Sequence, residues 1–486
     1  MRSHFWKALV GAAALLPAAA GAQVDFAHYV ALGDSLTAGF QSGGLSVSGQ
    51  QGSYPLWIHV QATGNDNFQQ PLVSEPGLPP QLKLKSLSPL QIVPKNGTGN
   101  PLNLYLPRPY DNLGVPGAKV HDTLATVTDN GGLHDLILRG LGTAWQQGLA
   151  LHPSLVTLWI GNNDVLAAAV SGIAIEGVTL TPAAQFEADY RALTGAIAAA
   201  GAKLALATIP RVTAIPYVIT IPPVVVNPAT QQPVLINGAT VPLIGPNGPL
   251  SPADKVLLSA QTELAQGKGI PVQLGGSGQP LSNSSVLSAA EITAIQAHAD
   301  AYNAVIRSVA NSTNSALVDT EALFDSIVAN GLSIGGIHYS NAFLTGGIFS
   351  YDGVHPTPFG YAYVANQFIG AINGKFGTSV PTISLRRVIR GGGAATAPVS
   401  AAEAQRAVLS EKAQANLRWS LQIPSKEYLE SIAGDGDGGG DGGGGDEGGG
   451  GDGGGGGDGG GGEGGGDGDG GHDHGGPHEH GGDGRR

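Results

Sequence analysis

The sequence predicts an α/β protein in which helices cover both faces of a mostly parallel sheet. Two observations predict this class: short apolar runs typical of buried strands, and longer segments between them with a helical repeat. Strands that alternate with helices form parallel sheets, because each helix returns the chain to the start of the next strand. The predicted strands cover residues 29–32, 155–160, 203–209 and 316–318, with a fifth around Leu113.

Three segments between or after these strands are predicted to be helices. In residues 186–200 the apolar side chains recur every three or four positions. Residues 288–310 begin with Ser288 and Glu291, which have the spacing of a capping box at a helix start. Residues 358–373 show the same helical repeat and close the domain.

Both ends of the chain are expected to lie outside the folded domain. Residues 1–22 combine a basic start, an apolar stretch too short to span a bilayer and a small-x-small cleavage site, which predicts a signal peptide and a secreted or periplasmic protein. Residues 434–486 contain only Gly, Asp, Glu, His, Pro and Arg, so they cannot bury apolar surface and are expected to be disordered. One large domain is expected over residues 23–390, with 391–433 as an extension or linker.

Composition excludes several classes of function. The 486 residues carry a formal net charge of −13, most of it in the 434–486 tail, so the charge says little about the folded domain. No basic patch indicates nucleic-acid binding. The chain has no cysteine, which excludes a cysteine nucleophile, a cysteine-zinc site, disulfides and a lipid anchor on cysteine. No stretch after residue 22 is apolar for long enough to form a transmembrane helix.

Two long segments interrupt the alternation of strands and helices. Residues 41–110 are rich in Gly, Pro, Ser and Gln, and residues 212–285 are rich in Pro and Val. Segments of this length inside a compact domain are usually functional or mobile. Both follow a predicted strand end, so they are expected either to overhang the carboxyl edge of the sheet or to be irregular surface covers.

The first chemical motif is Gly33-Asp34-Ser35, directly after the first strand. A parallel strand that ends here places the Ser35 hydroxyl at the carboxyl edge of the sheet, where open α/β sheets bind ligands. A helix that begins at Ser35 would surround it with unpaired N–H groups and the positive end of a dipole, which suits an oxyanion. Serine becomes a nucleophile only when a base and an oxyanion hole are placed around it.

The base is predicted in Asp352-Gly353-Val354-His355-Pro356, just before the last helix. A tight Asp-Gly turn can direct Asp352 and His355 toward the same place. His355 would then be the general base for Ser35, and Asp352 would hold the imidazole tautomer. A lone histidine near a helix start is more often a cap or a surface residue, but the serine motif makes the catalytic interpretation the better one.

Two further motifs could supply oxyanion donors. Gly161-Asn162-Asn163-Asp164 follows the strand at 155–160. An asparagine there can donate its amide N–H to the oxyanion, which is worth about 3 kcal/mol of transition-state stabilisation. The alternative is that the asparagines only form a turn that starts a helix. The loop 112–117 (NLGVPG) contains glycines whose N–H groups can approach a ligand closely. Asp34 and Asp164 are expected to hold caps and turns rather than to take part in catalysis.

The four motifs in this order resemble the SGNH/GDSL family of serine esterases and lipases, over residues 29–373 and with both long segments between motifs. The resemblance implies a flavodoxin-like three-layer α/β/α sandwich, an SGNH hydrolase domain over 23–390 and ester hydrolysis without a cofactor or metal. It implies Ser35 as nucleophile, His355 as base and Asp352 as third triad member. The oxyanion hole would consist of the Ser35 N–H, the Gly117 N–H and the Asn163 side chain. Gly114 is the alternative to Gly117 as the glycine donor. Gly117 is preferred because the glycine of the family lies some residues after an asparagine, as Gly117 lies after Asn112.

The substrate is expected to be a small-molecule or lipid ester. The Pro/Val-rich residues 212–248 favour acyl-chain or aryl esters, whereas Tyr54, Trp57 and Tyr217 are too few aromatics to indicate sugar stacking. A carbohydrate O-deacetylase of the same fold is the alternative enzyme. A different class is a secreted metal-binding protein that uses the acidic, His-containing tail for weak divalent-cation binding, although a solvating tail is the better interpretation.

Overall fold

The computed structural model describes residues 23–393, 397 and 399–434 and contains a central sheet of five parallel strands. All five predicted strands are confirmed. In spatial order the sheet is β13-β6-β5-β1-β4. The strands in chain order are β1 (Tyr29–Gly33), β4 (Asn112–Gly114), β5 (Leu155–Trp159), β6 (Lys203–Ala207) and β13 (Ala316–Val318).

The strand order places a topological switch point beside β1. The chain leaves β1 for β4 on one side and then returns to β5 on the other side. At the ends of these strands Gly33 pairs with Gly114 and with Trp159. This is the flavodoxin-like order, in which the crevice beyond the carboxyl ends of the strands binds the ligand. The segments that follow β1, β4 and β5 therefore meet at one edge.

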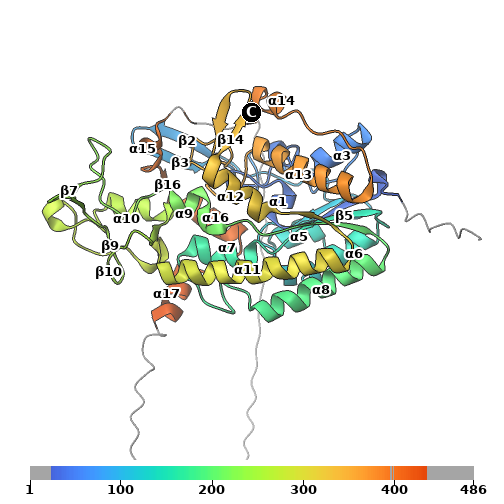
Figure 1. Ribbon diagram of the computed structural model, residues 1–486, viewed down its shortest axis with the longest axis horizontal. Helices are drawn as coiled ribbons and strands as arrows, with labels where there is room; N and C mark the ends of the chain where they lie inside the picture. Colours follow the sequence, from blue (N-terminus) through green and yellow to red (C-terminus); the bar gives the residue numbers. More distant parts are fainter. Residues whose placement is uncertain (1–22, 394–396, 398, 435–486) are drawn as a thin grey trace, which may run out of the picture. The chain divides into compact units, whose positions relative to one another are not determined.

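Helices cover both faces of the sheet and form a three-layer α/β/α sandwich (Figure 1). Alternate strand residues point to opposite faces, so Tyr29 and Ala31 join one buried cluster, and Val30 and Leu32 join another. The first face packs against α3 (Tyr54–Thr63) and α13 (Pro358–Phe376), and the second against α8 (Ala183–Ala199) and α11 (Ala289–Ser312). The three predicted helices are confirmed as α8, α11 and α13.

The capping signals explain where two of these helices begin. Ser288 caps α11 by accepting the Glu291 N–H, and the Glu291 side chain accepts the Ser288 N–H in return, as the capping-box spacing predicted. Thr357 caps α13, and Pro358 occupies the first helical position, where its missing N–H costs nothing.

The first long segment, 41–110, contributes a helix to the sandwich as well as irregular chain. Besides α3 it contains α2 (Val47–Gln50) and the antiparallel hairpin of β2 (Leu82–Leu87) and β3 (Leu90–Pro94). Its first residues return to the carboxyl edge of the sheet, because Ser42 and Gly43 donate hydrogen bonds to Ser350 and Asp352. This segment is therefore part of the fold around the site and not a detached cover.

The second long segment, 212–285, is built mostly as a separate small lobe. It contains α9 (Pro216–Ile219), α10 (Gln261–Ala265) and several two-residue strands. Its side chains form a hydrophobic cluster of their own, with Ile221, Val225, Leu243, Val256 and Leu281 among its members. Its first residues, together with Leu257 and Leu258, join the main core.

The described part of the C-terminal extension is docked on the domain. It contains α15 (Ala401–Ala404), β16 (Val408–Leu409), α16 (Glu411–Ser420) and α17 (Lys426–Gly434). Residues 401–419 do not form one continuous helix, because β16 pairs in parallel with β3 and Ser410 then caps a new helix. Buried Leu409, Leu417 and Leu421 belong to the main core cluster.

Two predictions about the ends of the chain fall outside the described residues. They are the signal peptide over 1–22 and the character of the tail after residue 434. Within the part of the chain that the structure describes, no helix combines the length and the apolar character needed to cross a membrane.

Candidate active site

Ser35 lies at the first position of a short helix directly after β1. Helix α1 (Ser35–Ala38) is capped by Asp34, whose Oδ1 accepts the Leu36 N–H at 2.9 Å. Asp34 Oδ2 accepts a hydrogen bond from the Asn162 amide at 2.7 Å, which links the end of β1 to the end of β5. Asp34 is fully buried, and this burial raises its pKa to about 6. Its role is to hold the turn that presents Ser35, as expected.

The structure brings Ser35, His355 and Asp352 into one hydrogen-bonded chain. His355 Nε2 lies 2.9 Å from Ser35 Oγ, and His355 Nδ1 lies 3.0 Å from Asp352 Oδ2. All three side chains are buried, and the Phe40 ring packs against the imidazole with centroids 4.8 Å apart. A serine with a histidine in contact, itself oriented by a carboxylate, has the geometry of an activated nucleophile.

The loop before α13 places Asp352 and His355 side by side. The Ser350 N–H donates to the His355 carbonyl, so the loop closes on itself. Gly353 has φ +71°, a conformation that favours glycine, and a Cβ there would lie 3.1 Å from the Tyr217 nitrogen. The sequence Asp-Gly-Val-His therefore produces this turn because glycine is required at its second position.

Asp352 is held by five hydrogen bonds. Its Oδ2 accepts from the Gly43 N–H at 2.7 Å and faces His355 Nδ1, while its Oδ1 accepts from the N–H groups of Val354 and His355 and from the Ser350 hydroxyl. Burial raises the pKa of this carboxyl, but the facing imidazole and the backbone donors outweigh it and lower the pKa below its usual value. Asp352 therefore stays ionised opposite His355.

The two candidate glycines of the loop after β4 differ in the hydrogen bonds of their N–H groups. The Gly114 N–H donates to the Asn112 side chain at 3.0 Å and is already used. Gly117 is buried, with φ +83°, and its N–H donates no hydrogen bond to another described residue. The Ser35 N–H likewise has no acceptor among the described residues. Buried N–H groups without partners are rare in proteins, so these two call for an explanation.

The two asparagines of the third motif have different surroundings. The Asn163 amide donates to the Ala118 carbonyl at 2.9 Å, beside Gly117. The Asn162 amide donates to Asp34 at 2.7 Å, and Asn162 lines the same cavity as Ser35 and His355. The family resemblance implies Asn163 as an oxyanion donor, and this stays a prediction, whereas Asn162 is the asparagine that lines the cavity. Consecutive residues at a helix start point about 100° apart, and helix phase was the signal that could have separated them.

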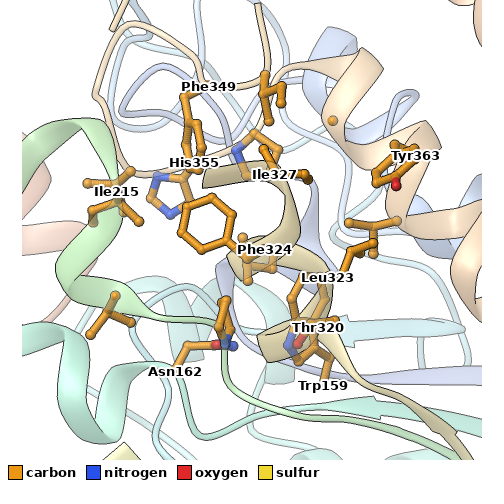
Figure 2. Close-up of a pocket in the computed structure, with 18 of the residues that line it drawn as sticks. Trp159, Asn162, Ile215, Thr320, Leu323, Phe324, Ile327, Phe349, His355 and Tyr363 are labelled. Atoms are coloured by element: carbon orange, nitrogen blue, oxygen red, sulfur yellow. The ribbon is translucent and has the colours of Figure 1, made fainter. Parts of the chain in front are cut away.

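An apolar cavity of about 110 Å³ opens beside Ser35 and His355 (Figure 2). One wall is α12 (Thr320–Asn330), and another is the loop that carries Asp352. The described residues that line it include no Asp, Glu, Lys or Arg. Its apolar lining includes Leu323, Phe324, Ile327, Ile348, Phe349 and Phe359.

The second long segment contributes little to this cavity. Only Val212 and Ile215, at its very start, are among the lining residues. Residues 212–248 were expected to favour acyl-chain or aryl esters, but their apolar side chains from Ile221 onward pack in the separate small lobe. The apolar character of the site comes from α12 and the Asp352 loop instead.

Asp164 holds the backbone just after the loop that contains Gly117. It is fully buried in the first turn of α7 (Asn163–Ser171), and its Oδ2 accepts the Val120 N–H at 3.1 Å at the start of α4 (Val120–Ala125). Burial raises its pKa from 3.8 to about 7. Asp164 therefore has the structural role that was expected of it.

Replacing Asp164 with asparagine is expected to change how stability depends on pH. Between the unfolded pKa of 3.8 and the folded pKa of about 7 the native state keeps a proton that the unfolded state has lost, so native stability falls as pH rises through this window. The asparagine side chain cannot ionise, so the substitution removes this loss. Relative to the parent, Asp164→Asn should gain roughly 3 kcal/mol in unfolding free energy between about pH 4.5 and about pH 7.5.

Denaturant unfolding of both proteins at the two pH values measures this difference. Asp66→Asn is the matched control, because Asp66 is exposed and its replacement removes one carboxylate without changing a buried contact. A stability difference between Asp164→Asn and the parent that stays constant with pH would contradict the prediction.

Fold and site together define a class of protein. A flavodoxin-like sheet with serine, histidine and aspartate in contact at its carboxyl edge is the arrangement of a hydrolase. The model of the family described as GDSL-like Lipase/Acylhydrolase matches residues 29–368. The chain belongs to this family, and its general chemistry is ester hydrolysis. No curated protein matches the chain.

Several solved structures are similar to the chain at low identity. An α/β-hydrolase enzyme from the metagenome of Lake Arreo is 17% identical, with 72% of this chain and 96% of that chain covered and a TM-score of 0.33. A catalytic mutant of an acetylxylan esterase from Geobacillus stearothermophilus is 16% identical, with coverage of 72% and 96% and a TM-score of 0.33. The lipase/acylhydrolase from Enterococcus faecalis is 13% identical, with coverage of 74% and 99% and a TM-score of 0.30.

The described residues show no clustered metal ligands. Within 23–393, 397 and 399–434, no group of three or more His, Asp or Glu side chains is placed to hold a metal ion. The acidic, His-containing tail, for which weak divalent-cation binding was the alternative to a solvating role, lies after residue 434, outside this part of the chain.

Proposed function

We propose that the protein hydrolyses carboxylic esters of apolar acyl groups through an acyl-enzyme on Ser35. The observation that carries this proposal is the apolar cavity that opens beside the hydrogen-bonded Ser35 and His355. A cavity without charged lining suits a hydrocarbon chain, because burying apolar surface is favourable while burying polar sugar hydroxyls without partners is costly.

In the first half of the reaction, Ser35 Oγ attacks the ester carbonyl carbon while its proton passes to His355 Nε2. The Nδ1–H of the resulting imidazolium donates to Asp352. The negative carbonyl oxygen accepts hydrogen bonds from the free N–H groups of Ser35 and Gly117 and from an asparagine amide of the third motif. The carbon–oxygen bond to the alcohol then breaks, and the alcohol oxygen takes the proton from Nε2.

In the second half, water attacks the acyl carbon and gives a proton to His355 Nε2. The tetrahedral intermediate collapses, the bond to Ser35 breaks and Oγ regains the proton. The product is the free acid.

The aromatic residues that could have indicated sugar binding are not available for it. Tyr54 is fully buried under the sheet, where its ring stacks on Phe368 at 4.8 Å. Tyr217 is also buried. Trp57 is half-buried on α3 and is not among the residues that line the cavity beside Ser35. An acyl-chain ester is therefore a better substrate for this site than an acetylated polysaccharide.

The specificity constant kcat/KM for p-nitrophenyl esters is expected to rise with acyl length from acetate to octanoate. Each buried methylene contributes about 0.8 kcal/mol, which is roughly a fourfold gain per carbon until the cavity is filled. Hydrolysis of acetylated xylan should be slow by comparison. An alkyl fluorophosphonate should modify the protein at Ser35, as peptide mass spectrometry would show.

Two neighbouring positions on α12 give a matched pair of variants. Ile327 lines the cavity and is 6% exposed, whereas Val328 is 43% exposed. Ile327→Trp should lower kcat/KM for octanoate at least about tenfold more than for acetate, and Val328→Trp should change neither by more than about twofold. A parent protein that prefers acetate esters and acetylated xylan would instead be a carbohydrate O-deacetylase.

The remaining expectations concern parts of the chain outside the structure. We propose that residues 1–22 direct export and are cleaved, so that the domain acts in the periplasm or outside the cell. The acidic tail then serves mainly as a solvating segment.

A further inference from the structure

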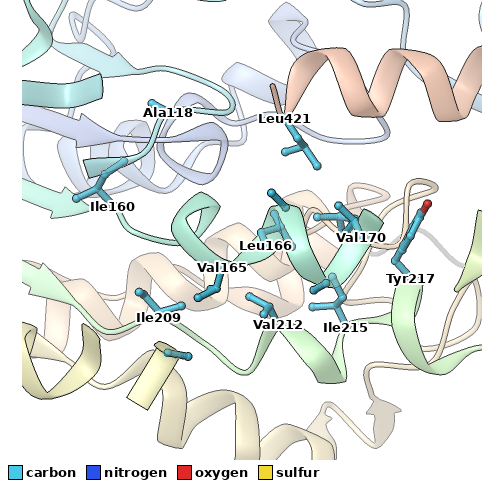
Figure 3. Packing of buried hydrophobic residues seen from close by; sticks show 14 of the residues in the cluster. Ala118, Ile160, Val165, Leu166, Val170, Ile209, Val212, Ile215, Tyr217 and Leu421 are labelled. Atoms are coloured by element: carbon cyan, nitrogen blue, oxygen red, sulfur yellow. The ribbon is translucent and has the colours of Figure 1, made fainter. Parts of the chain in front are cut away.

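The C-terminal extension covers the loop that carries Gly117. Pro116 and Gly117 are both buried. A Cβ placed on Gly117 would lie 2.8 Å from the Ser420 carbonyl oxygen and 2.8 Å from Cγ of Gln422, so the extension touches this glycine directly. Figure 3 shows Leu421, between these two residues, on the side of the core that Leu166 and Val170 of α7 form.

Gln422 ends α16 in a conformation that usually selects glycine. Its φ is +54°, the Gln422 N–H donates to the Trp419 carbonyl, and the Ile423 N–H donates to the Arg418 carbonyl. These two bonds form a Schellman motif, in which the left-handed position is normally Gly because a side chain there is strained. Such strain at one residue persists only where the surrounding structure holds it, so the contacts of the Gln422 side chain could explain why this conformation is kept.

The Gln422 side chain reaches the loop after β4. Its Nε2 donates to the Pro116 carbonyl at 3.4 Å. The same nitrogen lies 3.2 Å from Nδ1 of the buried His134, which also lies 3.2 Å from Asp129 Oδ2. Because a carboxylate oxygen only accepts, His134 Nδ1 donates to Asp129, and the Pro116 carbonyl is the acceptor for the Gln422 amide. Gln422 itself lies at the surface, so it contributes this amide without being part of the packed core.

The Pro116 carbonyl and the Gly117 N–H belong to the same peptide plane. This peptide bond is trans, so the carbonyl and the N–H point in opposite directions. A donor that holds the Pro116 oxygen on one side therefore sets the direction of the Gly117 N–H on the other. The next carbonyl but one, that of Ala118, is held by the Asn163 amide at 2.9 Å.

We propose that Gln422 is a positioning residue that aims the Gly117 N–H at the developing oxyanion, which makes the C-terminal extension part of the active site. This inference rests on the proposed function. Leu417, Leu421 and Ile423 anchor the extension in the core, and the Gln422 amide adds the contact that orients the peptide. Loss of a whole oxyanion donor costs about 10²- to 10³-fold in kcat, and a misdirected donor should cost less.

The test compares Gln422→Ala and Gln422→Glu with Gln414→Ala in the full chain. Gln414 is the matched control, because it lies in α16 of the same extension and its amide donates to Thr262 and Leu409, away from the loop. For p-nitrophenyl butanoate, kcat should fall about tenfold in both Gln422 variants with KM within about twofold of the parent. An alkylboronic acid, whose serine adduct carries the oxyanion, should bind more weakly by the same factor as kcat/KM.

The thermal unfolding midpoints separate positioning from structural damage. The Gln422 variants should unfold within a few degrees of Gln414→Ala, whose kcat should equal that of the parent. The inference would be overturned if Gln422→Ala had an unchanged kcat, a change confined to KM, or an unchanged affinity for the boronic acid. The proposed function would still stand in that case, provided that hydrolysis by the parent protein depends on Ser35. A parent protein that hydrolyses esters without Ser35 would overturn both.

Discussion

Replacing His355 with alanine is expected to lower kcat for ester hydrolysis by roughly 10⁵- to 10⁶-fold, and Ser35→Ala should have an effect of the same size. His355 Nε2 lies 2.9 Å from Ser35 Oγ and is the base in contact with that hydroxyl among the described residues. Without it the hydroxyl stays protonated, and a neutral serine is a poor nucleophile. Because nucleophile and base act as one unit, the double variant should be no slower than either single variant.

Single-turnover and steady-state rates on p-nitrophenyl butanoate measure these losses. The fluorophosphonate reaction gives an independent reading, since it should vanish in Ser35→Ala and become much slower in His355→Ala. Circular dichroism and unfolding curves establish that each variant is folded. If the double variant lost far more than either single variant, Ser35 and His355 would be acting separately and the proposed mechanism would be wrong.

The sheet and the serine turn were predictable because their signals are local. An apolar run that stops at Gly33-Asp34-Ser35 predicts both the end of β1 and the start of α1, and the structure shows both. The Asp-Gly turn likewise joins residues only three positions apart, so Asp352 and His355 could be paired from their spacing. In such cases the backbone geometry of a few residues determines which side chains meet.

The third motif shows what local spacing cannot settle. Gly161-Asn162-Asn163-Asp164 predicts an amide at the edge of β5, but both asparagines fit that description. Which of them faces the cavity depends on the phase of α7, and this phase is set by Asp34 and Ala118, far away in the chain. Tertiary contacts therefore placed Asn162 in the cavity lining and turned the Asn163 amide toward the Gly117 loop.

The docking of the C-terminal extension on the domain could not be predicted from the sequence either. Apolar residues of the extension have a weak helical repeat, and nothing in their spacing shows that Val408 and Leu409 pair with β3 of the first long segment. The second long segment follows a strand end, so from the sequence it could be either an overhang of the site or a surface cover. Most of its apolar residues bury one another in a separate cluster.

Asp352→Asn is expected to lower kcat by about 10³- to 10⁴-fold while leaving the fold intact. The carboxylate presents two acceptor oxygens to five donors, and an amide has only one oxygen. If the amide nitrogen takes the place of Oδ2, it meets the Gly43 N–H and donates to His355 Nδ1. The proton of the neutral imidazole then moves to Nε2, where it blocks proton transfer from Ser35.

The opposite orientation of the substituted amide should be less stable than the first. Its nitrogen would then face the backbone N–H groups of Val354 and His355, which lie 2.9 and 2.8 Å from Oδ1, and two donors would be left without an acceptor. The first orientation should therefore be favoured, so the loss appears in kcat at every pH at which Asp352 of the parent is ionised. Steady-state kinetics between about pH 6 and about pH 9 measure it.

Ser350→Ala separates the effect on the imidazole from a general loosening of the loop. Ser350 donates to Asp352 Oδ1 at 3.2 Å and accepts the Ser42 N–H, but it does not touch His355 Nδ1. Its removal should lower kcat by no more than about tenfold, since the carboxylate keeps its other donors. If Asp352→Asn were no more harmful than Ser350→Ala, the carboxylate would serve only to hold the loop. His355 would then keep its tautomer without a charged partner.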